Sequence, residues 1–464
     1  MKSTVNRTIG KFFEIEGLAE KARFLVDLLQ EYSVNFAINH SGSIKGNRRE
    51  KNRSGQSYLY KRLGMESEVF EIKMKDRVYS AELQRAVTTS LKRFPYMSAK
   101  LLQKEGDFYF VKNDQPMIIR ETKKLRKLGS WRTNKNLVDV TFKGKTLFIS
   151  FHHALADGEG IKPFIETLLF YYCSYRYHKR IKKVEGIRLA SEPLLVGETK
   201  DPFLKPYEYE EKEFPKIERN GFALPESVKS NDETNYRFEL LVEHSAFMAF
   251  AKKYNATPSI AVALVMGQAI KNLYPNFDKP IICNSAVSMR KALDCENSFK
   301  NCVKSIMFHY THELSEKPLK EQAVEFRNLL SAQRDTDYLK KSANEIIGLF
   351  EQLDQLPTYS EKQKIMTFFD EMLAHTYFLS YIGQFNFGNF GKYIETIHLY
   401  NSGVTGLGIN VIATDKYFCI LFKQSFPTEK YVDEFVKVLK TYDVECKKSP
   451  PIPFITPTDA LIKR

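Results

Sequence analysis

Hydrophobic residues recur at helical spacing in several segments of the first half of the chain, and shorter apolar runs lie between them. The spacing predicts three helices, over residues 11–35, 80–94 and 160–177. The second helix is expected to end at Pro95, because proline disfavours helix in the residue before it. The apolar runs predict an extended segment over residues 68–74 and two hairpins, over residues 100–111 and 138–151.

The second half of the chain repeats this mixture of patterns. Strands are predicted over residues 236–241, 280–287, 305–310, 378–383 and 394–400, with a hairpin over residues 408–426. Helices are predicted over residues 244–254, 259–274 and 428–440, with further helices between residues 318 and 375. The two halves contain strands and helices in similar proportion, which predicts an α/β protein with two lobes of comparable size.

Breaks in the pattern predict the domain organisation. Residues 1–56 are expected to form an N-terminal helix and a basic, solvated linker, because positive charges crowd together after residue 41 without apolar residues. Residues 57–190 are expected to form the N-terminal lobe. Prolines recur and periodicity lapses over residues 191–234, which predicts a connection between lobes. Residues 235–464 are expected to form the C-terminal lobe.

Composition narrows the class of protein. Of the 464 residues, 43% are hydrophobic and 27% are charged, as is typical of a folded globular protein. No apolar stretch reaches the roughly 20 residues that a membrane-spanning helix needs, and the N-terminus lacks the apolar core of a secretory signal. The six cysteines are dispersed and form no C-x-x-C pair, which favours a reducing compartment. We therefore expect a cytoplasmic protein without a transmembrane segment, and a monomer.

The charge of the chain indicates the kind of partner without selecting one. Lysine and arginine exceed aspartate and glutamate by 70 to 56, a formal net charge of +14. Such an excess favours anionic partners, which include phosphorylated cofactors, nucleic acid and an anionic membrane face.

The residues with the clearest chemistry are 151–158, Phe-His-His-Ala-Leu-Ala-Asp-Gly, where an apolar strand gives way to a helix. Adjacent histidines on an extended segment point to opposite sides, so His152 and His153 are poorly arranged to chelate one metal ion. A single neutral imidazole can instead take a proton from a hydroxyl or an amine and later return it. The carboxylate of Asp157 is expected to tie the loop to a distant arginine. Gly158 is expected to let the backbone reverse without a Cβ clash.

The pattern of these residues resembles the HHxxxDG signature of the coenzyme A-dependent acyltransferase superfamily. Chloramphenicol acetyltransferase, alcohol acetyltransferases and the condensation domains of nonribosomal peptide synthetases belong to it. The resemblance covers about residues 57–464 and implies two chloramphenicol acetyltransferase-like α/β sandwich lobes with an active-site tunnel between them. The DFGWG hallmark of the plant BAHD branch is absent, so the resemblance favours the bacterial alcohol acetyltransferase or condensation-domain branch.

The resemblance also implies roles for individual residues. His153 would be the catalytic base, and His152 and Gly158 would support the loop that carries it. Asp157 would belong to the catalytic group as its structural anchor, because the aspartate of the superfamily pairs with an arginine of the other lobe. Arg290, just past a predicted strand, is the expected partner.

Two further positions follow from the same resemblance. Asn301 stands in an Asn-Cys pair that is often seen downstream of that arginine, and it would support the site. Ser380 falls where relatives place a serine or threonine beside the developing oxyanion. Loss of such a hydrogen-bond donor costs on the order of 3–4 kcal/mol.

The expected function is transfer of an acyl group from a thioester to a hydroxyl or amine acceptor, with transfer to oxygen as the expected class. The donor would be acyl-CoA or an acyl carrier protein, and the acceptor a small alcohol or amine. No permanently bound cofactor and no metal are expected, and no coenzyme A-binding residue is assigned. Basic runs at residues 123–127 and 176–183 could contact the phosphates of coenzyme A, but they are interpreted as solvated faces. His309 and His312 are interpreted as unrelated, since a spacing of three on a strand places them on opposite faces.

Two other classes of function stay open. A non-catalytic descendant of the same fold could bind acyl chains or lipids as a carrier or regulator. A polyanion-binding protein would exploit the net charge, but the sequence contains no recognisable nucleic-acid motif, so no nucleic acid partner is expected.

Overall fold

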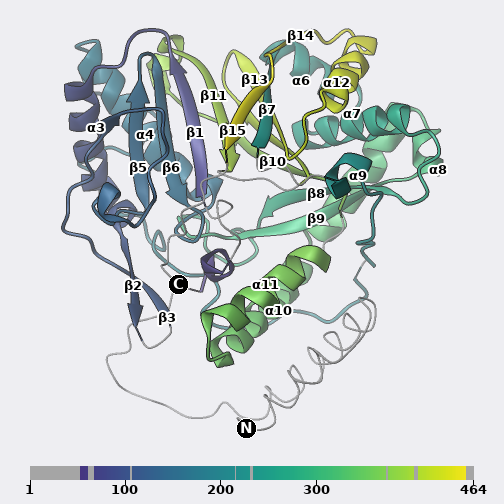
Figure 1. Cartoon of the computed structure of the whole chain (residues 1–464), viewed down its shortest axis with the longest axis horizontal. Coiled ribbons are helices and arrows are strands. Elements are labelled where there is room, and N and C mark those ends of the chain that lie inside the picture. Colours follow the sequence, from purple (N-terminus) through teal and green to yellow (C-terminus); the bar gives the residue numbers. More distant parts are fainter. Residues whose placement is uncertain are drawn as a thin grey trace.

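The structure is a computed structural model, and it describes residues 53–60, 67–104, 107–214, 216–229, 234–372, 375–401 and 406–455. Strands and helices are mixed throughout the described chain (Figure 1). The helix expected over residues 11–35 and the basic residues 41–52 lie outside the described residues.

The first sheet has five strands in the order β11-β1-β6-β5-β4. These strands are β1 (Ser67–Met74), β4 (Arg120–Glu121), β5 (Val138–Lys143), β6 (Thr146–His152) and β11 (Ile394–Asn401). Helices α3 (Ser80–Arg93) and α4 (Gly158–Arg176) cover one face of this sheet (Figure 1). Alternate residues of β1, including Phe70 and Ile72, pack into one core with the apolar stripes of both helices. A separate hairpin is formed by β2 (Lys100–Lys104) and β3 (Asp107–Val111).

The second sheet has eight strands in the order β14-β7-β13-β12-β10-β8-β9, with β15 also paired to β7. The strands are β7 (Thr234–Glu243), β8 (Ile281–Ser288), β9 (Val303–Tyr310), β10 (Tyr377–Gln384), β12 (Leu407–Ala413), β13 (Tyr417–Gln424), β14 (Cys446–Lys448) and β15 (Ile452–Ile455). The helices that share its core are α6 (His244–Lys253), α7 (Pro258–Leu273), α9 (Leu319–Gln333) and α12 (Lys430–Thr441). Helix α7 begins where the Thr257 hydroxyl accepts a hydrogen bond from the Ile260 N–H, with Pro258 at its first position.

The remaining elements are short or lie beside the two sheets. Helices α10 (Thr336–Gln355) and α11 (Tyr359–Met372) contribute to a third apolar cluster, together with the segment around η1 (Gln56–Leu59). The short elements are α5 (Pro225–Lys229), α8 (His312–Ser315), η2 (Pro95–Ser98), η3 (Trp131–Thr133) and η4 (Gly388–Tyr393). None of the helices in the described part of the chain is long and apolar enough to cross a membrane.

Strand β11 joins the two lobes. It follows β10 in the chain, yet it pairs with β1 of the first sheet, so that Asn401 lies opposite Glu68. It also packs against β12 and β13 of the second sheet. By sequence β11 belongs to the expected C-terminal lobe of residues 235–464, and by pairing it belongs to the first sheet.

The segment expected to connect the lobes is held tightly at one point. Both carboxylate oxygens of Glu198 accept hydrogen bonds from the buried guanidinium of Arg93, at 3.0 Å each. Arg188 and Tyr96 donate to the same carboxylate. Arg93 ends α3, so this part of the connection is packed into the N-terminal lobe.

The expectation of a solvated linker is wrong for its last residues. Ser54 and Gln56 are buried, because the carboxylate of Asp201 accepts hydrogen bonds from the backbone N–H groups of Arg53 and Ser54. The Arg53 side chain forms an ion pair with Asp354 on α10. The basic composition of this stretch gave no sign of these distant carboxylates.

Candidate active site

The histidine motif lies on a loop between two elements of the first lobe. Strand β6 ends at His152, and α4 begins at Gly158. Asp157 caps the helix, since its Oδ1 accepts a hydrogen bond from the Gly160 N–H at 2.7 Å. A strand end and a helix cap therefore fix both ends of the loop that carries His153.

His152 is a buried part of this loop. Its Nδ1 accepts a hydrogen bond from the Ala154 N–H at 3.0 Å. Burial, with a smaller effect of the neighbouring His153, lowers the pKa of His152 to about 3. His152 is therefore neutral at physiological pH and acts on the backbone of the loop.

His153 is held in one tautomer. Its Nδ1 lies 3.0 Å from the carbonyl oxygen of Ala156, and because a carbonyl can only accept, Nδ1 must carry the proton. The lone pair of the neutral ring is then on Nε2. The ring of Tyr58 stacks on the imidazole, with centroids 4.0 Å apart, and 11% of the His153 side chain is exposed. The free nitrogen belongs to a ring that is fixed and not completely covered.

Asp157 joins the lobes through Arg290. Its Oδ1 lies 2.7 Å from Nη2 of Arg290, and both side chains are almost completely buried. Its Oδ2 accepts a hydrogen bond from the Cys302 N–H at 2.8 Å. Arg290 also donates to the carbonyl oxygens of Ser298 and Lys300. The ion pair implied by the resemblance is thus present and anchors the loop between β8 and β9 to the motif.

Asn301 reaches the histidine from the same loop. Its Nδ2 lies 3.2 Å from the carbonyl oxygen of His153 and 3.0 Å from Nδ1 of the ring. Since Nδ1 donates to Ala156, the amide group donates to the carbonyl oxygen. Asn301 therefore braces the backbone of the residue that carries the reactive nitrogen.

Two glycines permit close approach of other elements to the start of α4. The expected role of Gly158 in a backbone reversal is not observed, because Gly158 is the first residue of the helix and lacks a positive φ. A Cβ on Gly158 would lie 2.8 Å from the Ile382 side chain of β10. A Cβ on Gly160 would lie 1.9 Å from the carbonyl oxygen of Phe299, so only glycine fits there.

Ser380 lies on β10, half-buried. Tyr377 and Leu379 of this strand face the core of the second lobe, and alternation places Ser380 on the opposite face, which it shares with Ile382. Ile382 lies against the motif loop. No hydrogen bond joins Ser380 to His153 among the residues that the structure describes.

Two residues of the site were not predicted from the sequence, Tyr58 and Glu68. Tyr58 belongs to η1, which Gly55 brings against the motif loop: a Cβ on Gly55 would lie 2.7 Å from the Ala154 carbonyl oxygen, and its φ is +73°. Oε1 of Glu68 lies 3.6 Å from Nε2 of His153. Only the pairing of β1 with β6, which places Glu68 opposite Phe151, could have indicated this position.

Glu68 begins a short polar chain toward the second lobe. Nδ2 of Asn401 donates a hydrogen bond to Glu68 Oε1 at 3.3 Å. Nζ of Lys423 in turn donates to Oδ1 of Asn401. Burial lowers the pKa of Lys423 to about 8, although the charge of Glu68 opposes this. The lysine is therefore mostly protonated at neutral pH.

Comparisons with known proteins show which structures this chain resembles. No family model and no curated protein matches the sequence. Its structure is similar to that of polyketide synthase associated protein 5 from Mycobacterium tuberculosis, with a TM-score of 0.55, 15% identity, and coverage of 81% of this chain and 94% of that one. F. graminearum TRI101, crystallised with coenzyme A and deoxynivalenol, gives a TM-score of 0.54 at 13% identity over 85% of this chain and 98% of that one.

A third similar structure is the epimerization domain from the third module of tyrocidine synthetase B. Its TM-score is 0.51 at 11% identity, over 82% of this chain and 90% of that one. The chain has the two-lobed chloramphenicol acetyltransferase-like fold. The two-lobed fold implied by the histidine motif is thereby confirmed, whereas the tunnel between the lobes, the superfamily and the branch within it stay predictions.

In this chloramphenicol acetyltransferase-like structure, His309 and His312 do not share a site. His309 and His312 each contact a different backbone carbonyl, of Glu218 and of Phe277. In the described part of the chain, no group of three or more histidine, cysteine, aspartate or glutamate side chains is arranged to hold a metal ion.

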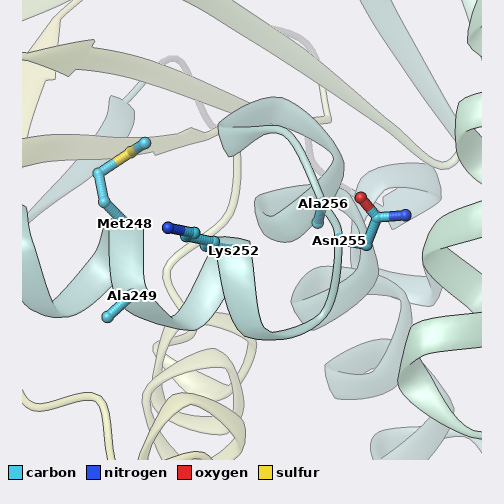
Figure 2. Close-up of a pocket in the computed structure, with 5 residues that line it drawn as sticks. All are labelled: Met248, Ala249, Lys252, Asn255 and Ala256. Carbon is cyan, nitrogen blue, oxygen red and sulfur yellow. The ribbon is translucent and has the colours of Figure 1, made fainter.

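A surface hollow lies along α6 and the turn before α7 (Figure 2). Its lining residues are Met248, Ala249, Lys252, Asn255 and Ala256. Lys252 is the single charged residue of this lining, and no proton acceptor of the imidazole or carboxylate type is present in it. The hollow therefore offers none of the chemistry found around His153.

Proposed function

We propose that the chain is an acyltransferase that moves an acyl group from a thioester to a hydroxyl or amine acceptor, with His153 as the general base. The observation that carries the proposal is the contact of His153 Nδ1 with the carbonyl oxygen of Ala156 at 3.0 Å. The Ala156 carbonyl accepts a hydrogen bond from the Nδ1–H group, which leaves the lone pair of the neutral ring on Nε2 to take a proton from the substrate. The similarity in fold to TRI101, crystallised with coenzyme A and an acceptor, supports this class of reaction.

The steps follow from one proton acceptor. Nε2 of His153 takes the proton of the acceptor as its oxygen or nitrogen attacks the thioester carbonyl. The tetrahedral intermediate carries a negative oxygen, for which the Ser380 hydroxyl is the proposed hydrogen-bond donor. When the carbon–sulfur bond breaks, the imidazolium returns the proton to the thiolate. The Asp157–Arg290 pair and Asn301 position the loop during these steps.

Acyl-CoA is the proposed donor, and a carrier-protein thioester is the alternative. The test is to incubate the purified full chain with acetyl-CoA and with a long-chain acyl-CoA over a panel of alcohols and amines. We expect thiol release that depends on the acceptor, and an acylated acceptor detected by mass spectrometry. Binding of acyl-CoA without any acceptor-dependent thiol release would contradict the proposal and favour a carrier.

A further inference from the structure

A carboxylate faces the reactive nitrogen of the proposed base. Glu68 Oε1 lies 3.6 Å from His153 Nε2, and about a tenth of each side chain is exposed. In the neutral ring the proton is on Nδ1, so Nε2 can only accept a hydrogen bond. Two hydrogen-bond acceptors, Nε2 of His153 and Oε1 of Glu68, therefore face each other across this distance. Such an arrangement is stabilised only when a donor of protons or a cation lies between them.

The carboxylate is fixed in this position from one side. Strand pairing places Glu68 between Phe151 of β6 and Asn401 of β11. Among the described residues, Asn401 is the one hydrogen-bond donor to the Glu68 side chain. Lys423 contacts the amide of Asn401 instead of the carboxylate. The negative charge beside Nε2 therefore has no direct cationic partner in the described part of the chain other than His153 itself.

The number of hydrogens on the group that receives the acyl chain decides what fits beside this pair. A hydroxyl carries one hydrogen and can donate to only one of the two atoms, Nε2 of His153 or Oε1 of Glu68. A primary ammonium carries three hydrogens and a positive charge, so it can donate to both atoms at once. An amine must also lose one proton before it can attack and a second as the amide forms, whereas a hydroxyl loses only one.

On the basis of the acyl transfer proposed above, we propose that Glu68 is a second proton acceptor of this site and that the acceptor is a primary amine bound in its protonated form. Glu68 binds the ammonium and takes its first proton. The resulting amine attacks the thioester carbonyl while His153 Nε2 takes the second proton.

The protons and bonds balance over the cycle. A carbon–nitrogen bond forms and the carbon–sulfur bond breaks. The His153 proton leaves on the thiol, and the Glu68 proton is released to solvent, so that thioester and ammonium give amide, thiol and one proton. The class of acceptor thereby differs from the transfer to oxygen that the sequence favours.

The test compares acceptors that share a carbon skeleton, benzylamine with benzyl alcohol and hexylamine with 1-hexanol, with acetyl-CoA as donor. Glu68→Gln removes the charge and keeps the shape. Glu395→Gln is the matched control, since Glu395 lies on β11 in the same sheet, is partly exposed, and pairs with Lys73. Steady-state thiol release gives kcat and KM, and calorimetry gives the affinity of each amine without donor.

We expect the unchanged chain to prefer each amine over its alcohol in kcat/KM. Glu68→Gln should lower kcat/KM for the amines by about a hundredfold, the scale of one general base, with both a higher KM and a lower kcat. The value for the alcohols should change little, and Glu395→Gln should match the unchanged chain.

Three results would overturn the role of Glu68: a preference of the unchanged chain for the alcohols, equal losses for amines and alcohols in Glu68→Gln, or amine affinities that are undetectable or unaffected by that change. Amine binding that Glu68→Gln abolishes, in a chain without thiol release, would instead refute acyl transfer and leave the amine site in place.

Discussion

His153 and Asp157 are four residues apart in the chain, and their side chains differ in how many of their polar atoms are hydrogen-bonded. The carboxylate of Asp157 is saturated: it accepts from Gly160, Cys302 and Arg290. His153 keeps one nitrogen free of such a bond. At the scale of single residues, this contrast separates the group that anchors the loop from the group available for proton transfer.

The anchoring role predicts a loss of stability. Asp157→Ala leaves the Arg290 guanidinium buried without its closest counter-charge, so we expect the free energy of unfolding to fall by about 3–5 kcal/mol, together with activity. Urea unfolding measures the change. Glu159→Ala is the control, because Glu159 also pairs with Arg290 but is half exposed, and its loss should cost about 1 kcal/mol or less. Equal effects of the two changes would contradict the anchoring role.

At the scale of elements, the site depends on how closely the loop after β8 approaches the first turn of α4. The carbonyl oxygen of Phe299 occupies the space that a side chain at position 160 would need. The same loop carries Arg290 and Asn301. A shift of α4 away from this loop would therefore separate the histidine motif from Arg290 and Asn301, which support it.

This contact predicts opposite effects of one substitution at two helical glycines. Gly160→Ala forces its Cβ against backbone, so we expect a loss of about 1–3 kcal/mol or more and reduced activity. Gly348→Ala, on α10 with open space around it, should stabilise the chain by about 0.4–1 kcal/mol. Thermal unfolding distinguishes the two, and a stable, active Gly160→Ala variant would contradict the packing.

Elements were predictable from the sequence where local signals determine them. Pro95 ends α3, Thr257 and Pro258 begin α7, and Asp157 caps α4, each within a few residues of the predicted limit. The pairing of β11 with β1 was not predictable, because it depends on contacts more than 300 residues apart in the chain. The short strands β4, β14 and β15 were missed as well.

The same distinction applies to the site. The motif marks His153 and Asp157 in the sequence, and the resemblance to the superfamily marks Arg290, which the structure places beside Asp157. Tyr58 was missed because it directly follows a segment that looks like a solvated linker, and the docking of that segment depends on Asp201 and Asp354. Glu68 was missed because a carboxylate at a strand end has no signature until its neighbours on β6 and β11 are known.

At the scale of the whole molecule, the two sheets meet through buried polar groups. His398 of β11 is buried, lies 3.6 Å from Glu239 of β7, and lies opposite Glu71 of β1. Arg237 of β7 forms an ion pair with Glu71 at 2.7 Å. Burial lowers the pKa of His398 to about 4, with Glu71 opposing and Arg237 assisting this shift.

A depressed histidine pKa makes the packing of the sheets sensitive to acid. The folded chain binds a proton at His398 less readily than the unfolded chain, whose histidine pKa is about 6.5. The contribution of His398 to the free energy of unfolding is therefore fully present above pH 6.5 and is lost as the pH falls toward 4. From pH 7 to pH 5 this group lowers the free energy of unfolding by about 2 kcal/mol. We expect His398→Gln to lose less stability by that amount over this range.

Urea unfolding at several pH values measures this difference. His178→Asn is the control, because His178 is exposed and its positive φ of 50° suits asparagine. A pH dependence of His398→Gln equal to that of the control would show that His398 does not contribute.

Acceptor-dependent thiol release by His153→Ala, measured together with its melting temperature, shows whether His153 is the general base. We expect a rate lower by about a hundred- to ten-thousandfold in a chain that still folds, with a melting temperature lowered only by the loss of the Tyr58 stacking and the Ala156 hydrogen bond. Thiol release at the rate of the unchanged chain, in a folded His153→Ala protein, would contradict this role.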